Sequence, residues 1–322
     1  MGSELKKLRI VFMGSPDFAI PSLEALVGSR HEIIAVVSGS DKRRGRGNEL
    51  MPTVVKKRAL ELGLSVVEAD NMKDPDFAIK LKSLNADLFV VVAFKILPPD
   101  VLAIPKIGSV NLHASLLPRY RGAAPIHRAV MNGDTETGVT VFFLDEKVDT
   151  GNFILQERVS IGEEETTGDV YNKLMHLGAD AIVRAVNEIA TGDYELIPQN
   201  DNDATSAPKI YQEDAFIQLN NQSKDIINLV RGMNPFPVAW MMLDGKKLKV
   251  FKARIPMDEL ELLSSLGVVD HGSLKVDSGR LFAMTHSGLI ELLDVQIEGK
   301  RRTTGEEFVR GYTGKMLLTD SF

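Results

Sequence analysis

Two polar side chains stand out because their types and spacing could do carbonyl chemistry. Asn111 and His113 lie two residues apart in the segment Ser109–Gly122, which reads SVNLHASLLPRYRG. If Val110–His113 is extended, both side chains project from the same face of the strand. An amide and an imidazole placed together can polarise a carbonyl oxygen and stabilise the oxyanion that develops on it. The alternative is a strand end with a surface Asn and a structural His, which is the commoner explanation for this spacing alone.

A carboxylate further along the chain could complete such a site. Asp149 follows the apolar run Val139–Leu144 and lies in the motif DEKVDTG. A carboxylate beyond a strand end could orient His113, or accept a proton directly or through water. Asp145 and Glu146 are rivals in the same loop. Turn formation by Asp-Thr-Gly is the simpler explanation of this motif by itself.

The composition argues against thiol and metal chemistry. The 322-residue chain has no cysteine, which excludes disulfides, a thiolate nucleophile and cysteine-bound zinc. Its six histidines show no pairing typical of metal ligands. We therefore expect a site without a metal.

The first half of the chain alternates strand patterns with helix patterns. The strand candidates are continuous apolar runs, which are typical of strands covered on both faces. They are Leu8–Met13, Ile33–Val37 and Leu88–Ala93. The helix candidates are Pro21–Val27, Pro52–Leu62 and Thr166–Ala190. This alternation predicts an α/β domain with a Rossmann-like, mostly parallel sheet, which would bind ligands at the carboxyl ends of its strands.

The pattern changes after a polar, turn-rich segment, Pro198–Pro208, which we interpret as a linker. Short strand candidates then follow one another, and Asp244-Gly245 between two of them indicates a hairpin. They are Val238–Leu243, Leu248–Ala253, Ser273–Val276, Leu281–Thr285 and Leu289–Leu293, with helices near Ser223–Arg231 and Gly305–Tyr312. A small β-barrel is the natural architecture for them. We predict domains at 1–192 and 210–322, joined by a linker at 193–209.

The charge balance disfavours a non-specific coat for nucleic acid. The formal net charge is −6, from 38 Lys+Arg and 44 Asp+Glu. Cations nevertheless gather in the segment Asp41–Met51, at Lys42, Arg43, Arg44 and Arg46. A flexible cationic loop can wrap phosphates, whereas the alternative is an ordinary solvated loop. No apolar run approaches the ~20 residues of a membrane helix. The absence of cysteine fits a reducing compartment, and we expect a cytoplasmic protein.

The motif around the Asn–His pair resembles a known family. Asn111-Leu-His113, Ser115–Gly122 and Asp149-Thr-Gly151 together resemble the folate-dependent formyltransferases. The motif is long and specific, so the resemblance favours the catalytic interpretation over the structural alternatives.

Further segments resemble the branch of that family that acts on charged initiator tRNA. Gly45–Pro52, which reads GRGNELMP, looks like its basic insertion loop. Asn234–Trp240 and Leu293–Lys300 look like parts of its C-terminal barrel, which is of OB type. The resemblance covers essentially the whole chain after the first few residues.

The resemblance implies a reaction and a set of residues. The formyl group of 10-formyltetrahydrofolate would pass to the amine of methionine esterified to initiator tRNA, without a metal. The implied catalytic residues are Asn111, His113 and Asp149. The implied folate-binding residues are Ser115, Leu116, Leu117 and Pro118. The implied tRNA-binding residues are Arg43, Arg44 and Arg46. We expect a monomer that binds this tRNA and the folate co-substrate and does not bind a membrane.

Three rival functions stay open. The acceptor could be a small amine on a nucleotide sugar or a ribonucleotide, but such enzymes would not need a basic loop and a barrel. A hydrolase that gives the formyl group to water would need no macromolecular surface. A nucleic-acid binding protein with an inert α/β domain would not need the Asn–His–Asp set.

Overall fold

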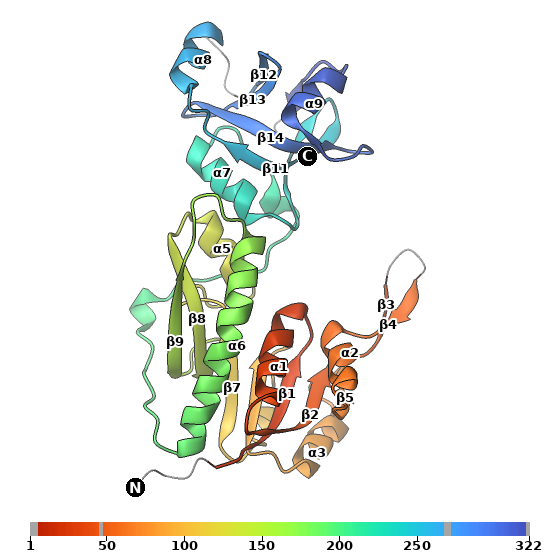
Figure 1. The fold of residues 1–322 in the computed structure, drawn as a ribbon, viewed down its shortest axis with the longest axis vertical. Coiled ribbons are helices and arrows are strands. Elements are labelled where there is room, and N and C mark those ends of the chain that lie inside the picture. The colour runs from red at the N-terminus through yellow and green to blue at the C-terminus, as the bar shows by residue number, and fades with distance from the viewer. Residues whose placement is uncertain (1–5, 45–47, 267–271, 320–322) are drawn as a thin grey trace. The chain divides into compact units, whose positions relative to one another are not determined.

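The computed structural model of this chain describes residues 6–44, 48–266 and 272–319. Contacts divide the chain into two units, each made of segments that are not continuous in the sequence. Figure 1 colours the ribbon by residue number, so these segments can be followed along the chain. The first unit comprises Met1–Pro125, Glu136–Ser160 and Tyr171–Ala207. The second comprises Ile126–Thr135, Ile161–Val170 and Pro208–Phe322. The division into domains at 1–192 and 210–322 with a linker at 193–209 stays a prediction, separate from this division by contacts.

Within the described residues, a seven-stranded sheet forms the centre of the first unit (Figure 1). Its order is β5-β2-β1-β6-β7-β8-β9. The strands are β1 (Arg9–Gly14), β2 (Glu32–Ser38), β5 (Val66–Glu68), β6 (Leu88–Val92), β7 (Gly108–His113), β8 (Glu136–Phe143) and β9 (Phe153–Ser160). Pairs from β5 through β7 are parallel, whereas β8 is antiparallel to both β7 and β9. The predicted mostly parallel sheet is confirmed.

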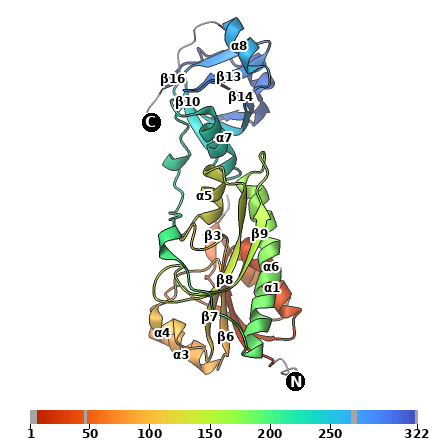
Figure 2. The same ribbon diagram turned by 90° about the vertical axis from the view of Figure 1, so that its left-hand side faces the viewer.

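Helices cover both faces of this sheet, with α1 and α6 on one side and α3 and α4 on the other (Figure 2). The helices are α1 (Ile20–Val27), α2 (Val54–Glu61), α3 (Pro75–Ser83), α4 (Pro99–Leu102) and α6 (Thr167–Thr191). Because both faces are covered, every residue of β6 is buried. This explains why its sequence, LFVVV, is continuously apolar and does not alternate.

Threonine side chains fix the starts of two helices. Thr53 precedes α2, and its hydroxyl accepts a hydrogen bond from the Lys56 N–H at 3.0 Å. Thr166 and Asp169 cap α6 reciprocally, because each side chain accepts from the other residue's N–H, at 3.3 and 2.9 Å. Gly192 follows α6 with φ +73°, a left-handed conformation that ends helices.

The cationic segment predicted as a loop contains a short hairpin. Strand β3 (Lys42–Arg44) pairs antiparallel with β4 (Glu49–Met51), and Lys42 lies opposite Met51. Asn48, at φ +51°, forms part of the turn before β4, a conformation that Asn tolerates better than most residues. Residues 45–47 lie outside the described part of the chain.

An antiparallel sheet forms the second unit, as the strand pattern predicts. The order is β12-β13-β14-β11-β10-β16, and β15 pairs with β14. The strands are β10 (Ala239–Leu243), β11 (Lys246–Arg254), β12 (Leu274–Asp277), β13 (Arg280–Met284), β14 (Leu289–Ile297), β15 (Thr303–Thr304) and β16 (Leu318–Thr319). Asp244 and Gly245 both have positive φ between β10 and β11, which confirms the predicted hairpin turn.

The remaining helices include one that the sequence pattern does not predict. Those helices are α5 (Pro125–Met131), α7 (Ser223–Gly232), α8 (Glu259–Leu266) and α9 (Gly305–Gly311). The short 3-10 helices are Asp17–Ala19, Asp201–Asp203 and Glu213–Ala215. The unpredicted helix is α8, in which Leu262 is buried against Phe282, Met284 and Leu289 from later strands. In the part of the chain that the structure describes, no helix combines the length and hydropathy of a membrane span.

Candidate active site

Strand β7 holds Asn111 and His113 on one face, as their spacing predicts. Asn111 pairs in register with Val91 of β6 and Phe142 of β8, and His113 lies opposite Thr140 of β8. The two backbones are therefore fixed by neighbouring strands. His113 is 7% exposed, whereas Asn111 is half-buried. Among the described residues, the Asn111 amide has no hydrogen-bond partner, so it is free to bind a substrate oxygen.

Asp149 reaches this strand end from the loop after β8. Its Oδ2 atom lies 3.7 Å from His113 Nδ1 and accepts a hydrogen bond from the Gly122 N–H at 2.8 Å. Its carboxylate is 11% exposed. Asp149 has φ +56°, a left-handed conformation that glycine adopts freely and that Asp, like Asn, tolerates better than most other residues. The fold thus brings together three side chains that the sequence separates by up to 38 positions (149 − 111).

The rival carboxylates of this loop lie in other environments. The Thr150 hydroxyl donates its one hydrogen to the Asp145 carboxylate, whose two oxygens lie 2.8 and 2.9 Å from Thr150 Oγ1. Asp145 Oδ1 also accepts from the Lys147 N–H at 3.0 Å. Glu146 is exposed. The loop from Asp145 to Gly151 is therefore a turn held by the hydrogen bond between Asp145 and Thr150. The same turn points the Asp149 side chain toward His113.

The imidazole of His113 is held by the loop that follows β7. Its Nε2 atom lies 2.9 Å from the Tyr120 carbonyl oxygen. Since a carbonyl can only accept, Nε2 carries the proton of this hydrogen bond. The Nδ1 atom then faces the Asp149 carboxylate, which would stabilise a positive charge on the ring.

This arrangement suits a reaction that builds negative charge on one oxygen and moves a proton. The Asn111 amide can donate to an oxyanion, and a protonated His113 can stabilise it. Asp149 Oδ1 has no protein partner among the described residues, so it is free to accept a proton or bind a water.

The segment Ser115–Pro118, which the resemblance assigns to folate binding, is a rigid turn beside the site. The Ser115 hydroxyl donates to the Arg119 carbonyl at 2.6 Å. Thr140 holds the turn by donating to the Ser115 carbonyl (2.7 Å) and accepting from the Leu117 N–H (3.1 Å). Ser115 and Leu117 are buried, whereas Leu116 and Pro118 are half-buried. Folate binding by Ser115, Leu116, Leu117 and Pro118 stays a prediction.

Two of the three predicted tRNA-binding cations, Arg43 and Arg44, belong to β3 of the β3–β4 hairpin. Arg43 is exposed, and its guanidinium donates to the Asn48 carbonyl at 3.0 Å. Arg44 belongs to β3, and Arg46 lies outside the described residues. The nearby cation Lys56 is already paired with Asp41 at 2.6 Å and Glu68 at 2.5 Å. These two hydrogen bonds raise the pKa of Lys56.

Three contributors to the site carry no sequence signal. Tyr120 and Gly122 act through backbone groups, which residue type does not reveal. Gln199 donates to the Asp149 carbonyl at 3.0 Å, yet it lies in the segment predicted as a linker. Its distance of 50 residues from Asp149 leaves no local pattern that could have predicted this contact.

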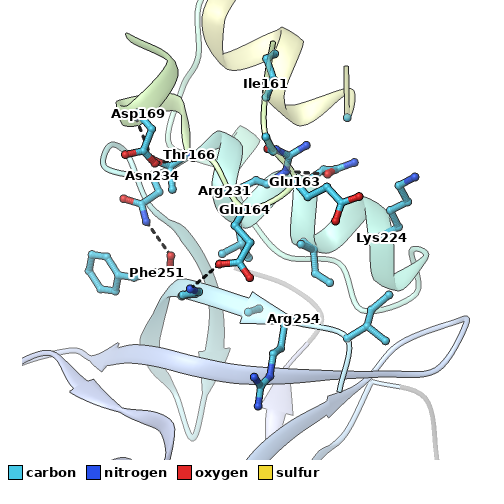
Figure 3. Close-up of a pocket in the computed structure, with 18 of the residues that line it drawn as sticks. Ile161, Glu163, Glu164, Thr166, Asp169, Lys224, Arg231, Asn234, Phe251 and Arg254 are labelled. Carbon is cyan, nitrogen blue, oxygen red and sulfur yellow. Dashed lines mark hydrogen bonds and ion pairs between the residues drawn. The ribbon is translucent and has the colours of Figure 1, made fainter. Parts of the chain in front are cut away.

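The second unit contains a separate cavity of about 610 Å³, whose lining includes neither Asn111, His113 nor Asp149 (Figure 3). Two ion pairs lie within its lining. Lys252 pairs with Glu164 at 3.0 Å, and Arg302 pairs with Asp294. Figure 3 shows Arg254 pointing away from Glu163 and Glu164. We therefore locate the chemistry in the first unit.

Two family models match this chain. One described as "Formyl transferase" matches residues 8–186, and one described as "Formyl transferase, C-terminal domain" matches residues 209–313. Together they account for most of both units.

Two relatives match over nearly their whole length. A protein of Chlorobium luteolum named "Methionyl-tRNA formyltransferase" is 44% identical over 308 residues, which cover 95% of this chain and 97% of that protein. A protein of Pelotomaculum thermopropionicum with the same name is 43% identical over 307 residues, which cover 94% and 96%.

A solved structure shares the fold. The N-formyltransferase of Helicobacter canadensis, in complex with folinic acid and dTDP-3-aminofucose, matches with a TM-score of 0.65 at 19% identity. The match covers 88% of this chain and 98% of that one.

Proposed function

The chain belongs to the formyl transferase family, and we propose that it transfers the formyl group of 10-formyltetrahydrofolate to the amino group of methionyl initiator tRNA. The observation that carries the choice of acceptor is the pair of nearly full-length relatives at 43–44% identity that are named methionyl-tRNA formyltransferases. The product would be formylmethionyl-tRNA, the charged tRNA that begins translation.

The site supplies what formyl transfer requires. The uncharged amine attacks the formyl carbon, a C–N bond forms, and the carbonyl electron pair moves to the oxygen. Asn111 and His113 stabilise that oxyanion from one face of β7, where the half-buried Asn111 amide has no protein partner among the described residues. The tetrahedral centre then collapses, and the bond from the formyl carbon to the folate nitrogen breaks.

Proton transfer is assigned to the His–Asp pair. Asp149 Oδ1 accepts the proton that the attacking amine loses, while Oδ2 stays bound to the Gly122 N–H. Asp149 then passes this proton to His113 Nδ1, which lies 3.7 Å from its carboxylate, and Nδ1 gives it to the departing folate nitrogen while Nε2–H stays bound to the Tyr120 carbonyl. The proton balance closes within the site, because one proton leaves the amine and one reaches the folate.

We assign folate binding to the rigid turn Ser115–Pro118 beside His113. The Helicobacter canadensis enzyme is solved with folinic acid, a folate, which supports a folate as formyl donor. The half-buried Leu116 and Pro118 would offer apolar contact, and the turn would present backbone groups to the ring. The cytoplasm is the proposed location, because charged initiator tRNA is found there, and a monomer the proposed state.

The experiment compares acceptors in one assay. The purified chain is incubated with 10-formyltetrahydrofolate and, in parallel, methionyl initiator tRNA, uncharged initiator tRNA, an amino nucleotide sugar, a ribonucleotide amine, or buffer. Formylmethionine should form in the first reaction alone. Formylation of a small amine would transfer the function to that acceptor class, and formate release in buffer would indicate a hydrolase. Binding of tRNA without turnover of any acceptor would indicate a nucleic-acid binding protein.

The hairpin cations are assigned to the tRNA backbone. Replacing Arg46 with Ala should raise the KM for tRNA and reduce the slope of log KM against log salt by about one, because one phosphate contact is lost. Arg43→Ala and Arg44→Ala serve as companions. Unchanged KM and salt slope in all three variants would remove this hairpin from the tRNA interface.

A further inference from the structure

A glutamine from the segment after α6 joins the two loops that meet at the site. Gln199 Nε2 donates to two carbonyl oxygens of the Asp149 loop, those of Asp149 at 3.0 Å and Gly151 at 2.8 Å. Gln199 Oε1 accepts from Arg121, from Nε at 3.1 Å and from Nη2 at 2.8 Å. Arg121 stands between Tyr120 and Gly122, whose backbone groups contact His113 and Asp149.

The backbone of Asp149 needs such support. With φ +56° it occupies a region that costs a non-glycine residue free energy, so the surrounding contacts must hold it there. The Asp149 carbonyl belongs to the peptide group that follows the Asp149 Cα, so the hydrogen bond from Gln199 fixes ψ of this residue, and the bond to the Gly151 carbonyl fixes the turn two residues further on. If the two carbonyls were released, the carboxylate would leave its position 3.7 Å from His113 Nδ1.

Gln199 is itself held by main-chain pairing on both sides. Before it, Ile197 and Phe153 exchange backbone hydrogen bonds at 2.9 and 3.0 Å. After it, the Arg121 N–H donates to the Thr205 carbonyl at 2.9 Å, and the Ala207 N–H donates to the Arg121 carbonyl at 2.7 Å. The amide is therefore a fixed point against which the site loops are placed.

The loop after β7 is shaped to accept this segment. Gly122 has φ +123°, and a Cβ atom there would lie 2.7 Å from the Ala207 carbonyl oxygen. The Tyr120 N–H donates to the Thr205 hydroxyl at 2.9 Å. The segment 199–207, predicted as a linker, thus packs within the first unit as part of the framework around His113 and Asp149.

We propose that Gln199 is a positioning residue for the transfer reaction, which places the Asp149 carboxylate opposite His113 by holding the carbonyls of Asp149 and Gly151. Gln199 acts through Asp149, because its side-chain hydrogen bonds among the described residues are with the carbonyls of Asp149 and Gly151 and with Arg121. This inference rests on the proposed function for its kinetic readout alone.

The two test variants differ in whether the side chain at position 199 can still accept a hydrogen bond from Arg121. Gln199→Glu keeps the acceptor for Arg121 but cannot donate to two carbonyls, and Gln199→Leu keeps the volume without either function. Asn200→Ala is the matched control, since Asn200 is the next residue and its side chain contacts only Asn202 and Asp203 among the described residues. We expect kcat to fall about 10- to 100-fold in both Gln199 variants, with KM values within twofold. Asn200→Ala should match wild type.

A double-mutant cycle separates positioning from general structural support. Added to Asp149→Asn, the Gln199→Leu change should lower kcat no further, because the group that Gln199 positions is already lost. Crystal structures of wild type and Gln199→Leu give a readout without turnover, in which the Asp149 carboxylate should move away from His113. The proposal is overturned if Asp149 stays in place, if kcat of Gln199→Leu stays within twofold of wild type, or if the two losses multiply. A wild type without turnover would instead refute the proposed function and leave the crystallographic comparison to decide on Gln199.

Discussion

The first unit and the second unit each contain a cluster of charged side chains that includes a buried carboxylate, and the two clusters differ in how fully their charges are matched. In the second unit, Glu291 accepts from Arg280 Nε and from Arg254 Nε, both at 2.8 Å. The Arg280 guanidinium also donates two hydrogen bonds to Asp258, from Nη1 to Oδ2 at 2.6 Å and from Nη2 to Oδ1 at 3.2 Å. In the first unit, His113 Nδ1 lies 3.7 Å from Asp149 Oδ2, which is longer than any of the Glu291 contacts.

The difference separates a structural role from a chemical one. Around Glu291, guanidinium donors bind both carboxylate oxygens, so each oxygen already has a charged protein partner. Around Asp149, one oxygen is held by a backbone N–H and the other has no protein partner among the described residues. Matched charges stabilise a fold, whereas incompletely matched groups at a strand end are available to a substrate.

The largest expected effect comes from breaking the incompletely matched cluster. Asn111→Ala and His113→Ala should each lower kcat by at least ~10²–10³, equivalent to about 2.7–4 kcal/mol of transition-state stabilisation. Asn111→Ala should leave the free energy of unfolding nearly unchanged, because its amide has no protein partner among the described residues. Steady-state kinetics and urea unfolding on the same preparations check both halves. Near-normal kcat in either variant would remove that residue from the catalytic role.

Breaking the matched cluster should have the opposite pattern. Glu291→Gln should lower the free energy of unfolding by roughly 3 kcal/mol, because two guanidinium groups lose their buried counter-charge. The kcat per folded molecule should equal that of wild type. Urea unfolding followed by circular dichroism measures the first quantity, and an assay below the transition measures the second. A loss of kcat without a loss of stability would contradict the comparison.

The pH dependence of stability should test the structural role of the Glu291 cluster further. Hydrogen bonds from Arg280 hold the pKa of Glu291 below its ordinary value of 4.5, although burial acts in the opposite direction. A carboxylate whose pKa is lowered by folding stabilises the fold above its unfolded pKa, and this contribution is lost as the pH falls through the folded pKa. The stability difference between wild type and Glu291→Gln should be constant from pH 8 to about pH 5 and shrink on further acidification. A difference that grows in acid would reverse the assigned sign.

The smallest effect is expected for the same substitution at an exposed pair. Glu164 binds Lys252 at 3.0 Å, and its side chain is 83% exposed. Glu164→Gln should change the free energy of unfolding by no more than about 0.5 kcal/mol, because water and salt screen exposed charges. The comparison with Glu291→Gln isolates burial as the cause. Equal losses in both variants would show that burial does not set the contribution of these pairs.

Local periodicity was sufficient to predict the sheet and part of the site. β1, β2 and β6 follow from apolar runs, and the shared face of Asn111 and His113 follows from a two-residue spacing in a segment taken as extended. Helix α8 could not be predicted in this way, because its buried Leu262 packs on strands formed later in the chain. Strand β9 was missed because it pairs at the edge of the sheet and alternates only weakly between buried and exposed residues.

The choice of carboxylate and the supporting contacts required the fold. Asp145, Glu146 and Asp149 have the same chemistry and lie in one loop, and the turn geometry alone decides which faces His113. The contact of Gln199 with Asp149 spans 50 residues and involves a backbone carbonyl, so residue type gives no indication of it. The sequence pattern predicts a linker at 198–208, because polar and turn-forming residues are typical of linkers, but the same residue types also suit a loop that pairs its backbone with a neighbouring loop.

At Asp149, the residue type that would best suit the left-handed backbone differs from the residue type that the proposed reaction requires. Glycine would adopt φ +56° without strain, so selection for an easily folded chain would favour Gly there. The proposed reaction requires the carboxylate, which glycine lacks. Asp149→Gly should therefore relieve the backbone strain at residue 149 and remove the proposed proton acceptor at once, so that a gain in stability and a loss of turnover come from the same atom positions.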